Sequence, residues 1–216
     1  MKKFSPLFLY ACLCFLPLAG CNQPSKNAAD SIQAIYDLYI LGDTRGISSL
    51  GMRDEDISKA QKVYDDSLKE TIRNNFASSG QEIDEDTLHR LCDARKKALA
   101  KMSASAKVTE TDDGKATVLV QTTYFDESAL DADAFYNARE DSLQNTFSNL
   151  EEQKAFLMNA YTENLIDAYQ KVAPSEDTIS ITVECVIQNN TWVPANMSSF
   201  GSDLALALTG QQASDL

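Results

Sequence analysis

The residue types best suited to catalysis are scarce in this chain of 216 residues, which contains five cysteines and a single histidine, His89. A serine or cysteine nucleophile needs a neighbouring base, and histidine is the usual one. The spacing predicts that His89 lies on the polar face of a helix beside Asp86, Arg90 and Asp93, where it is most simply a solvated side chain. The hydrolase signatures GxSxG, SxxK and HExxH do not occur. The sequence therefore predicts a protein that is not an enzyme.

Metal binding has little support in the sequence. The run Asp131-Ala132-Asp133 is similar to the start of a calcium loop, but Phe135 occupies the third ligand position and the following glycine is missing. A single histidine and cysteines without CxxC spacing do not assemble a typical zinc site. We expect no metal.

Acidic clusters precede two apolar stripes, at 54–56 and 84–86. Such carboxylates could serve acid–base chemistry if they were buried, but acids at a helix start also cap its N–H groups and complement its dipole. We favour the capping interpretation for the four aspartates Asp54, Asp56, Asp84 and Asp86.

Six tyrosines fall at apolar positions of the predicted helices and strands. They are Tyr36, Tyr39, Tyr64, Tyr124, Tyr161 and Tyr169. At such positions they either pack in the core or line a cavity between helices and sheet, and the packing interpretation is the simpler one.

The N-terminus carries a different signal. Lys2 and Lys3 form a short basic region, and residues 4–17 are almost wholly apolar. This run is too short to span a membrane as a stable helix, and its length and flanks are typical of a signal peptide. We therefore predict a signal peptide at residues 1–20.

The apolar run ends in Leu18-Ala19-Gly20-Cys21, which resembles the bacterial lipobox. In a lipobox the cysteine thiol is joined to diacylglycerol, and a peptidase then cuts on the N-terminal side of that cysteine. The resemblance implies cleavage between Gly20 and Cys21 and an N-palmitoyl, S-diacylglycerol modification of Cys21. Because two acyl chains anchor a protein stably, we expect a lipid-anchored protein on the extracytoplasmic side of the cell membrane. The alternative is an ordinary secretory signal with an incidental cysteine.

The remaining cysteines sort by position. Cys12 and Cys14 leave with the signal peptide, so Cys92 and Cys185 are the pair that stays beside Cys21. An even pair outside the cytoplasm is compatible with a disulfide, and both residues also fit as small buried hydrophobic side chains. Both possibilities stay open.

Charge and glycine usage exclude further classes. The formal net charge is −13, and removal of Lys2 and Lys3 leaves 17 basic against 32 acidic residues. Nucleic-acid binding depends on basic residues that neutralise phosphates, so we expect no nucleic acid partner. The eight glycines include no GxGxxG pattern, so we expect no nucleotide cofactor.

The elements that must position these residues alternate between helix and strand. Apolar residues at helical spacing predict helices over 30–41, 54–78 and 84–102, and then a long helical segment over 127–172 that is either two helices or one kinked helix. Alternating residues predict strands at 104–108, 116–125, 179–187 and 191–193, with turns at Asp113-Gly114 and Asn189-Asn190. This order indicates an α+β fold, with one small antiparallel sheet packed against several helices on one face.

The domain organisation follows from these elements. After the signal peptide, residues 21–29 are a lipidated N-terminus and tether, and residues 30–195 are a single α+β domain. Residues 196–216 are a C-terminal tail or a short helix.

Several segments together carry a family resemblance. After the lipobox, Leu50-Gly51 precedes an acidic-start helix; strand 106–108 turns through 112–115 into strand 116–124, and a helical insert leads to a closing strand with Trp192. The chain resembles lipoproteins of Firmicutes-type bacteria that are grouped as a domain of unknown function. These are similar in turn to cystatin-like and nuclear-transport-factor-like folds. The resemblance implies a fold and a location, and it supplies no catalytic residues.

We therefore expect a non-enzymatic, membrane-anchored domain that binds an envelope protein partner or a small ligand through the concave side of its sheet. The alternative is an enzyme whose acids and tyrosines meet only in three dimensions. Carboxylates with a raised pKa inside a cavity would favour the enzyme, and a dry cavity lined by tyrosine and leucine would count against it. A structural role with a stoichiometric partner and no pocket is a third possibility.

Overall fold

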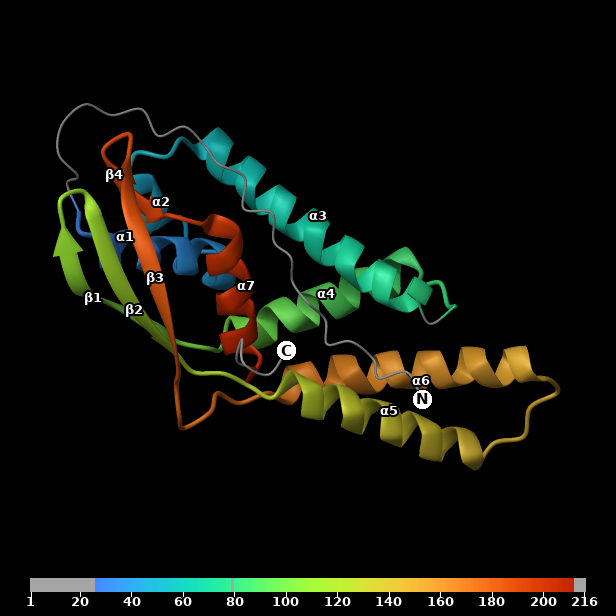
Figure 1. Cartoon of the computed structure of the whole chain (residues 1–216). Helices are drawn as coiled ribbons and strands as arrows, with labels where there is room; N and C mark the ends of the chain where they lie inside the picture. The colour runs from blue at the N-terminus through green and yellow to red at the C-terminus, as the bar shows by residue number, and fades with distance from the viewer. Residues whose placement is uncertain (1–25, 79, 212–216) are drawn as a thin grey trace.

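The computed structural model describes residues 26–78 and 80–211 (Figure 1). Within these residues, helical segments and strands follow the predicted α+β order. In chain order the elements are α1 (Ala28–Tyr36), η1, a π-helical segment (Asp37–Leu41), α2 (Arg45–Ser49), α3 (Asp54–Ser78), α4 (Glu85–Leu99), β1 (Ala104–Asp112), β2 (Lys115–Thr122), α5 (Glu127–Leu143), α6 (Leu150–Lys171), β3 (Ile179–Gln188), β4 (Thr191–Pro194) and α7 (Met197–Leu208).

The four strands form one antiparallel sheet in the order β1-β2-β3-β4. Val118 in the centre of β2 pairs with Val108 of β1 and with Val183 of β3. Successive side chains of a strand point to opposite faces, and the side chains of β2 alternate between buried and less buried positions. The predicted antiparallel sheet with one packed face is therefore confirmed.

The sequence also located both hairpin turns. Gly114 has φ of +78° between β1 and β2, and Asn189 and Asn190 have φ of +49° and +61° between β3 and β4. Two consecutive residues with positive φ are the mark of a type I′ turn, which asparagine tolerates better than most residues.

Two helices cover the packed face of the sheet. Helix α1 contacts β1, β2 and β4, and α7 contacts β3 and β4. The side chains of Ile32, Tyr36, Phe200 and Leu204 on these helices are buried. The segment after Pro194, for which a tail or a short helix was expected, is thus a twelve-residue helix. Its buried side chains extend the folded unit beyond the predicted boundary at residue 195.

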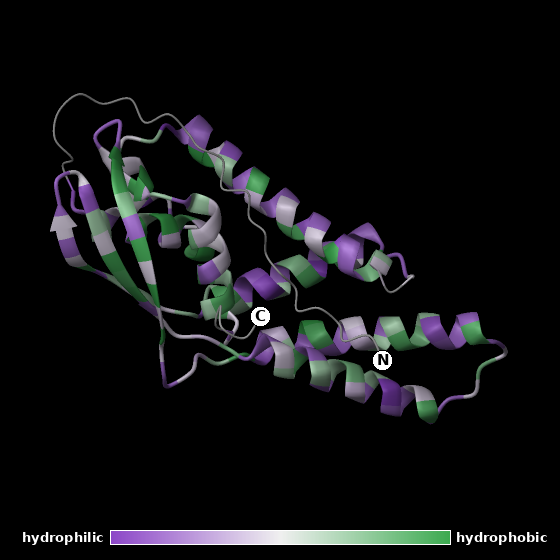
Figure 2. Ribbon diagram, viewed as in Figure 1, coloured by the Kyte–Doolittle hydropathy of each residue, from purple (hydrophilic) through white to green (hydrophobic). Residues whose placement is uncertain are grey.

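The other long helices project from one end of the sheet (Figure 1). Helices α5 and α6 pack against each other, α6 packs on α4, and α3 packs on α4. The long helical segment is two helices, because Asn149 starts α6 by accepting a hydrogen bond from the backbone N–H of Glu152 at 2.9 Å. Polar and apolar residues alternate along α3 as expected for a helix with one buried face (Figure 2).

Candidate functional site

The buried charge of Arg95 marks the candidate site. Arg95 lies in α4 on the same face as Leu88, Leu91, Ala98 and Leu99, and its exposed fraction is 1%. Because the helical period places all these positions on the side that packs in the core, the arginine is buried with them. A buried guanidinium is stable only if it is paired and hydrogen-bonded.

Its partner is Glu127, the first residue of α5. The Nε and Nη2 atoms of Arg95 donate to the two carboxylate oxygens of Glu127 at 2.7 and 3.0 Å. The hydroxyl of Tyr169, from α6, donates to Glu127 Oε1 at 2.6 Å. Glu127 is 6% exposed and Tyr169 is 1% exposed. Three helices therefore meet at one buried, hydrogen-bonded cluster, which we call the Arg95 triad (Arg95, Glu127 and Tyr169).

The electrostatics of the triad keep Arg95 positively charged. Burial lowers the pKa of Arg95, but the negative charge of Glu127 and the hydrogen bonds to it outweigh burial, so the net pKa is raised. Burial, followed by the charge of Glu127, raises the pKa of the Tyr169 hydroxyl well above its ordinary value. Arg95 therefore stays positive, Glu127 balances it, and Tyr169 acts as a hydrogen-bond donor.

One nitrogen of the guanidinium has no partner. Arg95 Nη1 is buried and makes no hydrogen bond. Because Nε and Nη2 lie on the edge of the guanidinium that faces Glu127, the two N–H groups of Nη1 lie on the opposite edge of this planar group. Arg95 is also one of the residues that line a pocket of about 30 Å³. We call this space the Arg95 pocket.

The walls of the Arg95 pocket are almost wholly apolar. Helix α7 closes one side with Phe200, Leu204, Ala205 and Leu208, and Leu99 of α4 lies next to Arg95. Helices α1, η1 and α3 supply the remaining wall through Ile35, Ile40, Tyr39 and Tyr64. No strand residue is among the lining residues described. We expected a site on the concave side of the sheet. The pocket lies instead in the helical layer that covers the sheet.

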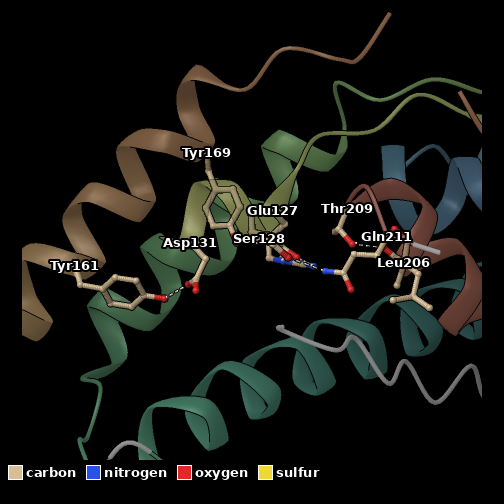
Figure 3. A network of polar contacts seen from close by, with 10 residues as sticks. Glu127, Ser128, Asp131, Tyr161, Tyr169, Leu206, Thr209 and Gln211 are labelled. Atoms are coloured by element: carbon tan, nitrogen blue, oxygen red, sulfur yellow. Dashed lines mark hydrogen bonds and ion pairs between the residues drawn. The ribbon is translucent and has the colours of Figure 1, made fainter. Parts of the chain in front are cut away.

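The C-terminal end of α7 is hydrogen-bonded to Glu127, the residue that pairs with Arg95. The backbone N–H of Glu127 donates to the carbonyl of Thr209 at 3.3 Å, and Gln211 Nε2 donates to Ser128 Oγ at 3.2 Å. Figure 3 shows Gln211 directed towards Ser128 beside Glu127. The first residues of α5 therefore contact both Arg95, which lines the pocket, and the end of α7, which closes one side of it.

A second acid–tyrosine pair lies further along α5. The hydroxyl of Tyr161 donates to Asp131 Oδ1 (Figure 3). Burial raises the pKa of Asp131, and the hydrogen bond from Tyr161 acts in the opposite direction. Burial, followed by the charge of Asp131, raises the pKa of Tyr161. Neither residue lines the Arg95 pocket, so this pair is a contact between α5 and α6 rather than part of the cavity.

An open groove of about 610 Å³ runs along α5 and α6. Its carboxylates include Asp126, Asp133 and Asp167. Asp126 caps α5 by accepting from the N–H of Ala129, and Asp167 forms an ion pair with Lys171. Across the described residues, no group of three or more His, Cys, Asp or Glu side chains could hold a metal ion.

The predicted tyrosines divide between the two expected roles. Tyr39 and Tyr64 line the Arg95 pocket, with ring centroids 5.6 Å apart. Tyr36, Tyr161 and Tyr169 are buried and donate hydrogen bonds to protein oxygens. The sixth, Tyr124, lines the open groove beside α5 and α6.

Of the four aspartates at the acidic helix starts, Asp84 has the capping role that the sequence predicts. Asp84 accepts a hydrogen bond from the N–H of Thr87 at 2.9 Å, and Asp86 lies in the first turn of α4. Asp54 and Asp56 lie in the first turn of α3, where Asp56 pairs with Arg53. None of these carboxylates lines the Arg95 pocket.

His89 lies on the exposed face of α4 that the helical spacing predicts for it. Its Nε2 is 3.4 Å from the Nζ of Lys69. The ring is therefore a surface group, away from the Arg95 pocket.

The sequence left open whether Cys92 and Cys185 form a disulfide or are buried separately. In the structure both are free, buried thiols. Cys92 lies on α4, which packs against α3 and α6, whereas Cys185 lies on β3, which packs against β2, β4 and α7. Because the two residues belong to different layers of the fold, each fills the core as a small hydrophobic side chain.

Arg95 falls on the apolar stripe of α4, but its role was not predicted from the sequence. An arginine in the middle of such a stripe signals a buried charge that needs a partner. Glu127 carries no comparable signal, because its partner lies 32 residues away.

The lipidation site, Cys21, and the expected cleavage site after Gly20 lie outside the described residues. Within the described part of the chain, no helix combines the length and the apolar character that crossing a membrane requires.

Fold and site together define an α+β domain with a small apolar pocket enclosed by helices. The model of the family "Domain of unknown function (DUF5105)" matches residues 22–200, and the chain belongs to this family. The resemblance seen in the sequence is therefore confirmed at the level of the family.

A solved structure is similar to this fold. YcdA from Bacillus subtilis, described as a candidate lipoprotein, has a TM-score of 0.62 and 18% identity, over 84% of this chain and 55% of that one. This chain thus spans just over half the length of YcdA. The comparison with curated proteins gives no significant match.

Proposed function

We propose that this protein is a lipid-anchored, extracytoplasmic binding domain whose Arg95 pocket takes a small, largely apolar ligand. The lipobox-like sequence that ends at Cys21 supports the anchor, and the similarity to YcdA, described as a candidate lipoprotein, agrees with it. Held by this anchor, the acidic domain would project from the membrane into the envelope.

The observation that carries the binding proposal is the apolar pocket itself, which a buried, charged arginine lines. The Nη1 atom of this arginine is a buried donor without a partner, which lowers stability by about 1–3 kcal/mol. If this position served only the stability of the core, an apolar side chain would stabilise the protein more than the arginine does.

A second candidate function is an enzyme that uses the acid–tyrosine pair, and the raised pKa of Asp131 is the observation in its favour. Asp131 and Tyr161 lie outside the Arg95 pocket, whose walls are mainly leucine, isoleucine and aromatic rings. A pocket with such walls supports ligand binding without catalysis. We therefore favour the binding function over the enzyme.

The experiment is the recovery of the ligand from protein made in its own host. The protein is purified from membranes in mild detergent, extracted with organic solvent, and the extract is analysed by mass spectrometry. Ala205→Leu fills the pocket from α7, and Ala155→Leu makes the same change at an exposed position of α6.

We expect a near-stoichiometric molecule with the unchanged protein and with Ala155→Leu, and its loss with Ala205→Leu. Recovery of no molecule from any of the three proteins would contradict the pocket proposal. A stoichiometric protein partner, captured by crosslinking and unaffected by Ala205→Leu, would instead favour an adaptor role.

The anchor is tested separately with Cys21→Ser. The unchanged protein should incorporate labelled palmitate and sediment with membranes, and the variant should do neither. Membrane association of the variant without any lipid label would contradict anchoring through Cys21.

A further inference from the structure

The open groove along α5 and α6 is a surface feature separate from the Arg95 pocket. Its volume is about 610 Å³, and none of its described lining residues lines that pocket. We call it the α5–α6 groove. Clefts that hold ligands usually measure about 300–1,000 Å³, so this groove is large enough for one.

The length of the groove indicates the kind of ligand that it fits. Its lining residues include Asp126 and Asn137 on one side, and Asn164 and Ser175 on the other. From Asp126 to Asn137 the chain advances roughly 16 Å, at about 1.5 Å per helical residue. An extended peptide of about five residues covers the same distance, at about 3.3 Å per residue. A single small ion would fill only part of such a groove.

The floor of the groove is apolar. Phe125, Ala134 and Val172 line it and are buried. Leu130 and Ala168 also line it and are partly buried. Burial of apolar side chains against these residues is favourable, so the floor favours a ligand with apolar groups.

The rim of the groove is acidic. Asp126, Asp133 and Asp167 are exposed there, and Lys171 is the one basic residue among the lining residues described. Lys171 pairs with Asp167, and Asp126 caps α5 through the N–H of Ala129. Asp133 forms no ion pair with another described residue. The groove therefore keeps a net negative charge, which attracts cationic groups.

Charge also disfavours three other occupants. A second copy of this chain carries a net charge of −13, and anionic lipid headgroups are negative as well. The last residues of the chain, 212–216, include Asp215 and no lysine or arginine. A basic segment of a different protein is the occupant that suits both the rim and the floor.

We propose that the α5–α6 groove binds a short, extended segment of a partner protein in which basic and apolar side chains alternate. Successive side chains of an extended chain point to opposite sides. The apolar side chains of the segment contact the floor, and its long basic side chains reach the carboxylates of the rim. This site goes beyond the proposed function, which concerns the Arg95 pocket.

The test uses the mature chain with Cys21→Ser, which needs no detergent, and three peptides with blocked ends. The peptides are Lys-Leu-Lys-Leu-Lys, Ser-Leu-Ser-Leu-Ser and Glu-Leu-Glu-Leu-Glu. Binding at neutral pH and low ionic strength is followed by NMR through the backbone amide signals of the groove residues.

Two variants and two controls accompany the peptides. Ala168→Leu fills the groove from α6, and Ala155→Leu makes the same change at an exposed position of that helix outside the groove. Asp133→Asn removes a carboxylate of the rim. Asp141→Asn is its control, because Asp141 is an exposed residue of α5 that is not among the described lining residues.

We expect the lysine peptide to bind at least about tenfold more tightly than the serine peptide, and the glutamate peptide not to bind. Added salt should weaken this binding, because salt screens exposed charges. Ala168→Leu should abolish it, and Asp133→Asn should weaken it about two- to fivefold. Both controls, and Ala205→Leu in the Arg95 pocket, should leave it nearly unchanged.

Equal binding of the lysine and serine peptides, or binding of no peptide, would overturn the proposal. Equal weakening by Asp133→Asn and Asp141→Asn would also overturn it, because the peptide would then be attracted to the acidic surface as a whole. A dimer of the unchanged protein in sedimentation, dissociated by Ala168→Leu, would assign the groove to a second copy instead. None of these outcomes would affect the proposed function of the Arg95 pocket.

Discussion

The carboxylate of Glu127 accepts hydrogen bonds from both Nε and Nη2 of Arg95, across 32 residues of sequence and in the interior of the helical layer. This geometry places Nη1 on the edge of the guanidinium that is turned away from Glu127. The contact that stabilises the charge therefore leaves one buried nitrogen of Arg95 without a hydrogen-bond partner.

The Arg95–Glu127 pair can be tested by a double-mutant cycle. Glu127→Gln leaves the charge of Arg95 buried without balance, so the free energy of unfolding should fall by about 3–5 kcal/mol. The variant Arg95→Met combined with Glu127→Gln should lose less than the sum of the two single changes, because neither charge is then left alone. Urea denaturation followed by circular dichroism measures all four proteins. Additive losses would show that the pair is not coupled.

The Tyr169 hydroxyl should contribute more than an ordinary buried tyrosine hydroxyl. Tyr169→Phe removes a bond to a carboxylate, and the free energy of unfolding should fall by about 1.5–3 kcal/mol. Tyr36→Phe is the matched control, because the Tyr36 hydroxyl donates to the neutral carbonyl of Met102, and its loss should be about 0.5–1.5 kcal/mol. A larger loss for Tyr36→Phe than for Tyr169→Phe would contradict the charged triad.

Stability should depend on pH through Asp131. Burial raises the folded-state pKa of Asp131 above the ordinary value of an aspartate, so the fold favours the protonated carboxyl. The resulting stabilisation is fully present below the unfolded-state pKa and is lost as pH rises through the folded-state pKa. Asp131→Asn stays uncharged, so its stability relative to the unchanged protein should increase with pH over this window. Urea titrations at a series of pH values measure the difference, and a difference that does not vary with pH would refute the shift.

The two buried thiols should be inert in the folded protein. Burial raises the pKa of Cys92 to about 11 and that of Cys185 to about 12, so the reactive thiolate is rare at neutral pH. Iodoacetamide should leave both unmodified in the native mature chain and should label both after denaturation without a reducing agent. Labelling that requires prior reduction would indicate a disulfide and would contradict the free-thiol arrangement.

The sequence was informative wherever a local period or a turn residue determined the structure. Apolar spacing located the long helices, and Asn189-Asn190 located the second hairpin. The cap of α6 at Asn149 agrees with the polar break expected there. These features depend on neighbours a few residues apart, which a pattern along the chain records.

The site was not predictable in the same way. Arg95 is a charged residue on an apolar stripe, and its pairing with Glu127 and Tyr169 depends on how three helices meet. The contribution of α7 to the pocket was also hidden, because its leucines fit a frayed tail as well as a helix. The state of Cys92 and Cys185 stayed open for a related reason, since an even number of cysteines says nothing about the layers they occupy.

The most direct test of the central claim is a crystal structure of the protein purified from the membranes of its own host. The account predicts electron density for a bound molecule in the Arg95 pocket, in contact with Leu204 and Leu208 of α7. A structure with no molecule in this pocket would contradict it.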